Sequence, residues 1–172
     1  MILFIPIANG QSIPSNVLKS IVCQTEYIDI IPCSSPGVIN SGRHILNPED
    51  KFKKLYCECV SRNIAKSIII EDELVAMQDR DIVHLYPDNF TKCIDYMKSN
   101  LNIGAVAMPW QDEPDKFHIR NACFIIRSSV LSKLNFRIDR LNHICETMRC
   151  DIYNLGFEYK FFPSNKKLIQ EI

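Results

Sequence analysis

Residues 74–81 of this chain read Leu74-Val75-Ala76-Met77-Gln78-Asp79-Arg80-Asp81, a continuous apolar run that ends in two carboxylates one residue apart. A short apolar run with a sharp polar end is typical of a buried β-strand. Because side chains alternate along a strand, we expect Asp79 and Asp81 on one face at its carboxyl end, where open α/β sheets bind ligands. Carboxylates bind hard cations such as Mg²⁺ or Mn²⁺, which keep coordination positions for water and phosphate. The alternative is a solvated strand end followed by a turn.

The sequence on either side of this stretch alternates strand patterns with helix patterns. Apolar runs predict strands at residues 2–7, 27–33, 74–78, 103–108, 122–126 and 157–162. Apolar side chains at helical spacing predict helices at residues 14–23, 48–67, 87–101, 130–134 and 141–155. Gly156 is expected to end the last helix, and residues 109–118 to form a loop. This order predicts an α/β fold with a mainly parallel central sheet flanked by helices on both faces.

The composition predicts one globular domain over residues 1–172, since the chain has no linker and is 47% hydrophobic. Lys and Arg number 20, as do Asp and Glu, which argues against nucleic acid as a general partner. The apolar start is too short for a signal peptide, and no stretch is long enough to span a membrane. We therefore expect a cytoplasmic protein without an integral membrane segment, whose 8 cysteines are free thiols.

Several motifs in this order resemble the family 2 glycosyltransferases, which have the Rossmann-like GT-A fold and use nucleotide-diphosphate sugars. The resemblance is carried by Ile5-Pro6-Ile7-Ala8-Asn9, Ser61-Arg62-Asn63-Ile64-Ala65, Met77-Gln78-Asp79-Arg80-Asp81 and residues 18–25, 86–90, 122–131 and 154–160. It spans residues 2–163, which is nearly the whole chain. The resemblance implies transfer of a sugar to a hydroxyl acceptor, by direct displacement with inversion.

The resemblance also implies how the donor and a Mn²⁺ or Mg²⁺ ion are bound. Asp81 would bind the metal between the two phosphates, and Asp79 would bind the metal or the ribose. His118 is a further candidate metal ligand, with a solvated loop histidine as the alternative. Arg62 would lie beside the base and diphosphate, or else be a surface ion-pair partner. The implied nucleotide contacts are Pro6, Ile7, Ala8, Asn9, Ser34, Arg62, Asn63, Asp79 and Arg80.

The general base that activates the acceptor hydroxyl should be a carboxylate near the start of the helix at 141–155. Glu146 is the first candidate and Asp139 the second. One alternative function is a non-catalytic protein of the same fold that binds sugar nucleotides or a partner. A nucleotidyltransferase is disfavoured, because the segment after the first strand, Ala8-Asn9-Gly10-Gln11-Ser12, carries no basic residue. The acceptor, whether a glycan, a lipid-linked sugar or a protein, is left open.

Overall fold

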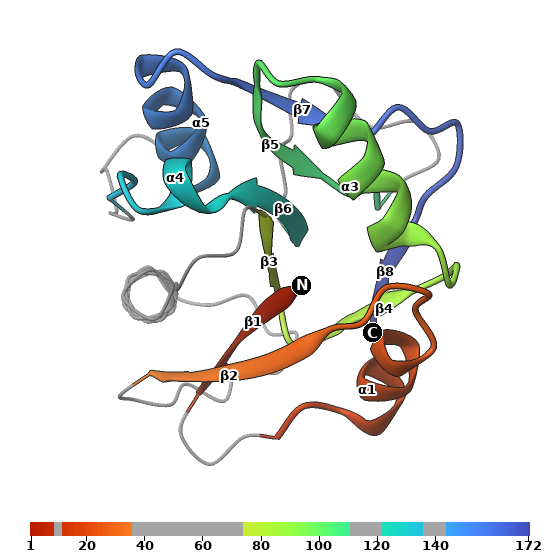
Figure 1. Ribbon diagram of the computed structural model, residues 1–172. Coiled ribbons are helices and arrows are strands. Elements are labelled where there is room, and N and C mark those ends of the chain that lie inside the picture. The colour runs from red at the N-terminus through yellow and green to blue at the C-terminus, as the bar shows by residue number, and fades with distance from the viewer. Residues whose placement is uncertain (9–11, 36–73, 111–121, 136–143) are drawn as a thin grey trace.

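A six-stranded central sheet organises the chain in a computed structural model that describes residues 1–8, 12–35, 74–110, 122–135 and 144–172 (Figure 1). Its strand order is β2-β1-β3-β6-β5-β7. The strands run over β1 Ile2–Ala8, β2 Asp29–Ser35, β3 Leu74–Gln78, β5 Ile103–Ala107, β6 Cys123–Arg127 and β7 Glu158–Phe161. The apolar stretch of the sequence, β3, therefore lies in the interior of the sheet.

Strand directions confirm the predicted mainly parallel sheet, with one exception. β1 pairs parallel with β2 and β3, and β5 pairs parallel with β7. β6 runs antiparallel to both of its neighbours, β3 and β5. The sequence between β5 and β6 has no helical pattern, and a return without a crossover helix gives an antiparallel neighbour.

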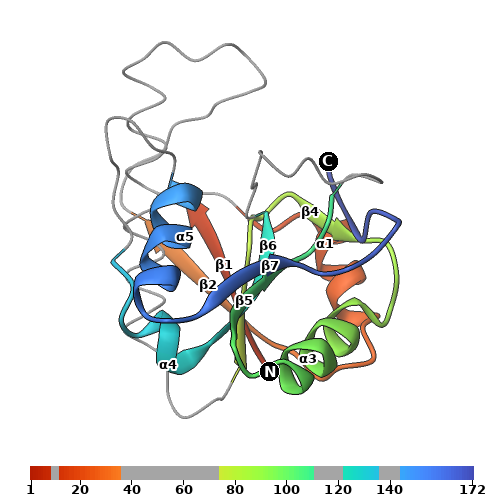
Figure 2. The same cartoon turned by 90° about the horizontal axis from the view of Figure 1, so that it is seen from above.

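Helices cover both faces of the sheet, as predicted. α1 (Ser15–Val22) and α3 (Asn89–Ser99) lie on one face, and α4 (Ser128–Leu131) and α5 (Ile144–Asn154) lie on the other (Figure 2). Within β3, Leu74 and Ala76 belong to the apolar cluster of the first face. Val75 and Met77 belong to the cluster of the second face. Burial on both faces explains why β3 is apolar throughout rather than alternating.

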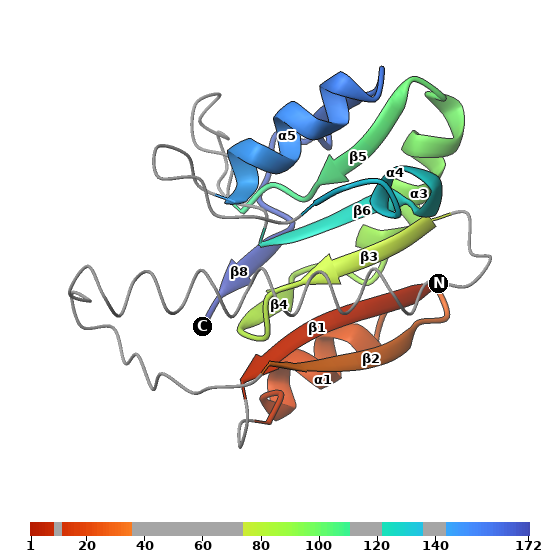
Figure 3. The ribbon, with the colours of Figure 1, turned by 90° about the vertical axis from the view of Figure 1, so that its left-hand side faces the viewer.

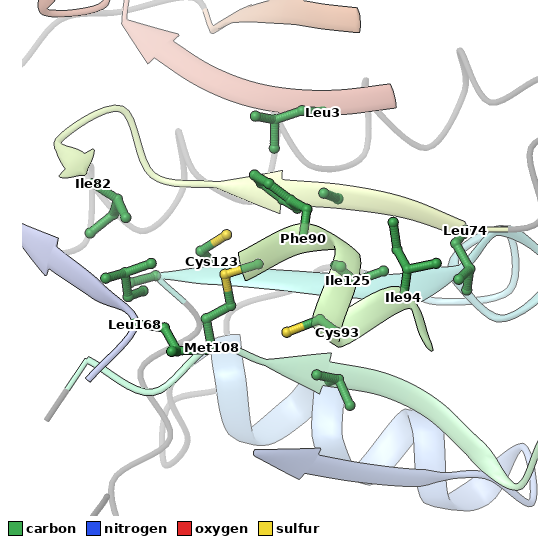
Figure 4. Close-up of a cluster of buried hydrophobic side chains, with 14 of the residues drawn as sticks. Leu3, Leu74, Ile82, Phe90, Cys93, Ile94, Met108, Cys123, Ile125 and Leu168 are labelled. Carbon is green, nitrogen blue, oxygen red and sulfur yellow. The ribbon is translucent and has the colours of Figure 1, made fainter. Parts of the chain in front are cut away.

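α3 packs on the sheet through residues spaced three and four apart. Phe90, Cys93 and Ile94 point from this helix onto side chains of the central strands (Figure 4). Burial raises the pKa of the Cys93 thiol to about 12, and burial also raises the pKa of the Cys123 thiol well above its usual value. Both thiols therefore stay protonated and act as small hydrophobic side chains.

Some elements differ from the sequence prediction at their ends. β2 begins two residues later than predicted, and α4 occupies only Ser128–Leu131. Gly156, with φ of 83°, follows α5 as the predicted helix stop. The predicted helix at 48–67 lies outside the described residues. A second sheet was not predicted: β4 (Ile82–His84) pairs antiparallel with β8 (Ile169–Glu171).

Within the described ranges, no helix has both the length and the apolar character required to cross a membrane.

The carboxyl end of α3 is held by the buried guanidinium of Arg127. Its Nη2 donates to the carbonyl oxygens of Met97 at 2.8 Å and Asn100 at 3.4 Å, and its Nε donates to Ile103 O at 2.9 Å. Arg127→Met should remove these three hydrogen bonds from a buried charged group, lowering the free energy of unfolding by about 2–3 kcal/mol. Urea unfolding measures this change, and a variant as stable as the wild type would contradict it.

Candidate functional site

The turn that carries the two carboxylates follows β3 at the carboxyl edge of the sheet. β3 ends at Gln78, and Asp79, Arg80 and Asp81 lead from it into β4. β1, β2 and β3 all point toward this edge (Figure 3). Asp79 and Asp81 are both half-buried. The turn therefore lies at the edge of the sheet where the sequence predicts it.

Backbone hydrogen bonds tie this turn to two other parts of the chain. The Asp79 amide donates to the carbonyl oxygen of Ala122, just before β6, at 2.8 Å. The Ile172 amide, just after β8, donates to the carbonyl oxygen of Asp81 at 3.0 Å. The Ile82 amide closes the turn on the Asp79 carbonyl at 3.3 Å. These bonds fix the backbone positions from which both carboxylates project.

Arg80, between the two carboxylates, connects the turn with the segment that leads into α1. Its Nη1 donates to the carbonyl oxygen of Ser12 at 3.2 Å. This contact joins the end of β3 to the residues that follow β1. Since Arg80 is engaged with the backbone, its contact with a nucleotide stays a prediction.

The donor set of the turn suits a hard divalent cation. Among the residues that the structure describes, no three His, Cys, Asp or Glu side chains gather closely enough to hold a metal. Two carboxylates are nevertheless the kind of site that Mg²⁺ uses, because it completes its shell with water and substrate phosphates. Asp79 and Asp81 therefore have the chemistry that such an ion prefers, and their binding of a metal stays a prediction.

The predicted nucleotide contacts on β1 and β2 lie side by side at the same edge. Ile7 pairs with Ser34, and Ala8 pairs with Ser35. The pairing of β1 with β3 extends only to Phe4 and Met77, so the last residues of β1 run past it. Pro6 and Ile7 are half-buried. The fold therefore gathers the ends of β1 and β2 and the Asp79–Asp81 turn along one edge.

Glu146 lies in the first turn of α5, whose N-terminal end faces the same edge of the sheet (Figure 3). Its role as a base stays a prediction. Five further predicted site residues lie outside the described part of the chain: Asn9, Arg62, Asn63, His118 and Asp139.

Three buried polar side chains behind the turn were not predicted. His84 Nε2 and Gln78 Oε1 are 2.7 Å apart, and Gln78 Nε2 donates to the carbonyl oxygen of Ile82 at 2.8 Å. Asn89 Nδ2 lies 3.4 Å from His84 Nδ1 and donates to Leu168 O at 2.7 Å. Burial lowers the pKa of His84 to about 4, so its ring is neutral at pH 7. The available sequence signal was a glutamine ending an otherwise apolar strand, since buried polar groups need partners.

Comparisons with known proteins support the fold. No protein-family model matches the sequence, and no curated protein matches it. Solved structures do match. Mannosyltransferase PcManGT from Pyrobaculum calidifontis, in complex with GDP-Man and Mn²⁺, aligns with a TM-score of 0.66 and 12% identity over 95% of this chain and 54% of that chain.

Two further structures give the same result. TarS from S. aureus aligns with a TM-score of 0.65 and 9% identity over 99% of this chain and 36% of its own. A Drosophila β-1,4-galactosyltransferase 7 with manganese, UDP-Gal and xylobiose gives 0.59 and 10% over 99% and 70%. The chain thus has the fold of GT-A-type glycosyltransferases, and it spans about half or less of the first two structures.

Proposed function

We propose that this chain is a metal-dependent glycosyltransferase domain that moves a sugar from a nucleotide-diphosphate sugar to a hydroxyl acceptor. The observation that carries this proposal is the placement of Asp79 and Asp81, in a backbone-anchored turn at the carboxyl end of an interior strand. The GT-A fold supports it, since two matching structures contain a nucleotide sugar together with manganese. The proposal assigns the carboxylates to a Mn²⁺ or Mg²⁺ ion.

The residues of the chain divide the work of the reaction. Asp81 would hold the ion, with Asp79 binding either the ion or the ribose. A bound divalent ion would offset the negative charge that develops on the departing nucleoside diphosphate. The ends of β1 and β2, including Ala8 and Ser34, would receive the nucleotide. Arg62 and Asn63 would lie beside its base and diphosphate.

The acceptor hydroxyl needs a base to remove its proton as the sugar is transferred. We assign this step to Glu146, because α5 begins at the edge of the sheet where the Asp79–Asp81 turn lies. Asp139 is the second candidate. Attack of the hydroxyl from the side opposite the diphosphate would invert the configuration at the sugar carbon.

A thermal-shift panel with UDP-, GDP- and CDP-sugars, each with and without Mn²⁺, tests the proposal. Binding at about 100 times the dissociation constant stabilises the native state by about 2.7 kcal/mol, which raises Tm by about 5–10 °C for a chain of this length. We expect this rise only when the matching nucleotide sugar and Mn²⁺ are both present.

Asp81→Asn should remove the Mn²⁺-dependent part of the rise. Asp95→Asn is the matched control, because Asp95 is an exposed carboxylate on α3. An unchanged shift in Asp81→Asn would contradict the assigned metal site. A stabilising nucleotide sugar that is never converted to free nucleoside diphosphate would instead indicate the non-catalytic binding protein.

A further inference from the structure

The most unusual feature beside the proposed site is the buried hydrogen-bond network formed by the side chains of Gln78, His84 and Asn89. Their exposed fractions are 1%, 6% and 0%. These residues come from β3, β4 and α3, so the network connects three elements next to the Asp79–Asp81 turn. None of the three takes part in the chemistry assigned above.

The hydrogen bonds within this network are consistent with one arrangement of protons. The Gln78 amide donates to Ile82 O, so its oxygen faces His84 and requires a donor there. His84 therefore carries its proton on Nε2 and leaves Nδ1 as an acceptor. Asn89 Nδ2 faces that nitrogen while donating its stronger bond to Leu168 O. Each donor nitrogen of this network thus has an acceptor when His84 is neutral.

The hydrogen-bond network spans the turn that carries Asp79 and Asp81. Gln78 directly precedes Asp79, and Ile82 directly follows Asp81, so the bond from the Gln78 amide to Ile82 O closes the loop behind both. His84 is itself fixed, because its backbone amide donates to Ser20 Oγ at 3.1 Å and its ring contacts Phe90 with centroids 4.5 Å apart. A buried side-chain hydrogen bond thus spans the turn that carries Asp79 and Asp81, in addition to the backbone bonds that anchor it.

Stabilisation of the fold does not by itself explain this hydrogen-bond network. Asn89 Oδ1 is buried and has no hydrogen-bond partner in the described part of the chain. A buried polar network with an unsatisfied acceptor is less favourable than apolar packing of the same volume. Its energetic disadvantage favours a role in geometry over a role in holding the fold together.

We propose that Gln78 and His84 are positioning residues that set the geometry of the Asp79–Asp81 cation site. This inference depends on the proposed function. Neither residue touches the ion or the donor, and both act through the backbone of the turn. Groups that orient metal ligands typically change metal affinity by about 10- to 100-fold when they are removed.

Gln78→Met tests this role, because methionine keeps the volume of the side chain and loses both of its hydrogen bonds. The measurement is calorimetric titration of Mn²⁺ into the protein with whichever of UDP, GDP or CDP stabilises the wild type. We expect the Mn²⁺ dissociation constant of Gln78→Met to rise about 10- to 100-fold. His84→Gln should raise it in the same direction.

Arg127→Met is the matched control, since Arg127 is also a buried polar residue but lies at the other end of the β3–β6 pairing. It should lower Tm while leaving the Mn²⁺ dissociation constant unchanged. Wild-type affinity in Gln78→Met would overturn the positioning role alone. Absence of Mn²⁺ binding by the wild type with all three nucleotides would overturn the proposed function and this role with it.

A second measurement covers the case in which Gln78→Met fails to fold. Long-range ¹H–¹⁵N correlation spectra of the wild type distinguish the two neutral histidine tautomers. We expect His84 at pH 7 to be neutral, with its proton on Nε2. A ring protonated on Nδ1, or charged, would overturn the arrangement on which the positioning role depends.

Discussion

Replacement of Asp81 by asparagine is expected to lower the rate of nucleoside diphosphate release from the bound nucleotide sugar by about 100- to 1,000-fold. Asparagine keeps the size of the side chain and removes its charge, so the turn should keep its backbone contacts with Ala122 and Ile172. What is lost is the carboxylate that would hold the ion between the phosphates. The rate is measured by coupling released nucleoside diphosphate to a chromogenic assay, with Mn²⁺ present.

The exposed carboxylate of Asp95 provides the comparison for this prediction. Asp95→Asn makes the same chemical change on α3 and should retain the wild-type rate. If Asp81→Asn also retained that rate at the same Mn²⁺ concentration, the catalytic role of the turn would be wrong even if the chain proved to be a glycosyltransferase.

Acid should destabilise the protein through His84. The pKa of this histidine is 6.5 in an unfolded chain and about 4 in the native state, because burial disfavours its charged form. Between these values the unfolded chain binds more protons than the native state, so stability falls as the pH is lowered through this window. The loss attributable to His84 should reach about 3 kcal/mol at pH 4, with none above pH 7.

Urea unfolding of the wild type and His84→Gln between pH 7.5 and pH 4 isolates this contribution. The variant should be less stable than the wild type at pH 7.5, because it disturbs the buried hydrogen-bond network of Gln78, His84 and Asn89. The gap should then narrow as the pH falls, since glutamine takes up no proton. A constant gap across this range would contradict the assignment of the titration to His84.

Much of the sheet could be predicted because burial on two faces leaves a direct mark on the sequence. β3 was predicted at residues 74–78, where it is found. Its apolar residues pack into the clusters on both faces of the sheet, and the polar residues on either side mark where the strand begins and ends. β2 was shifted by two residues because Tyr27 has a high strand propensity but is 77% exposed. Its far end, Ser34 and Ser35, is held by backbone pairing with β1, which side-chain pattern does not reveal.

The direction of β6 and the pairing of β4 with β8 depend on contacts between residues far apart in the chain. His84 pairs with Ile169, and three-residue strands such as these carry too few residues for a periodic signal. The buried hydrogen-bond network of Gln78, His84 and Asn89 was not predicted for the same reason. Its members are read as a strand end, a connecting segment and a helix start until the fold brings them together.

The candidate site was predictable only in part. The strand before Asp79 and Asp81 and its place in the sheet were sufficient to locate their turn at the carboxyl edge, but both residues follow β3 in a turn, so strand alternation does not apply to them and their shared face stays a prediction. The contacts that hold their turn come from Ala122, Ser12 and Ile172, none of which the sequence marks as a site residue. Local pattern thus located the carboxylates, whereas their anchoring depended on tertiary structure.

The most direct test of the central claim is electron paramagnetic resonance of Mn²⁺ with the protein and the nucleoside diphosphate that it binds. The free Mn²⁺ signal should fall when protein and nucleotide are added together, beyond the loss caused by each alone, and Asp95→Asn should behave like the wild type. Asp81→Asn should leave the signal at the level set by the nucleotide alone. Equal loss of free Mn²⁺ with Asp81→Asn and wild type would contradict a cation site at the Asp79–Asp81 turn.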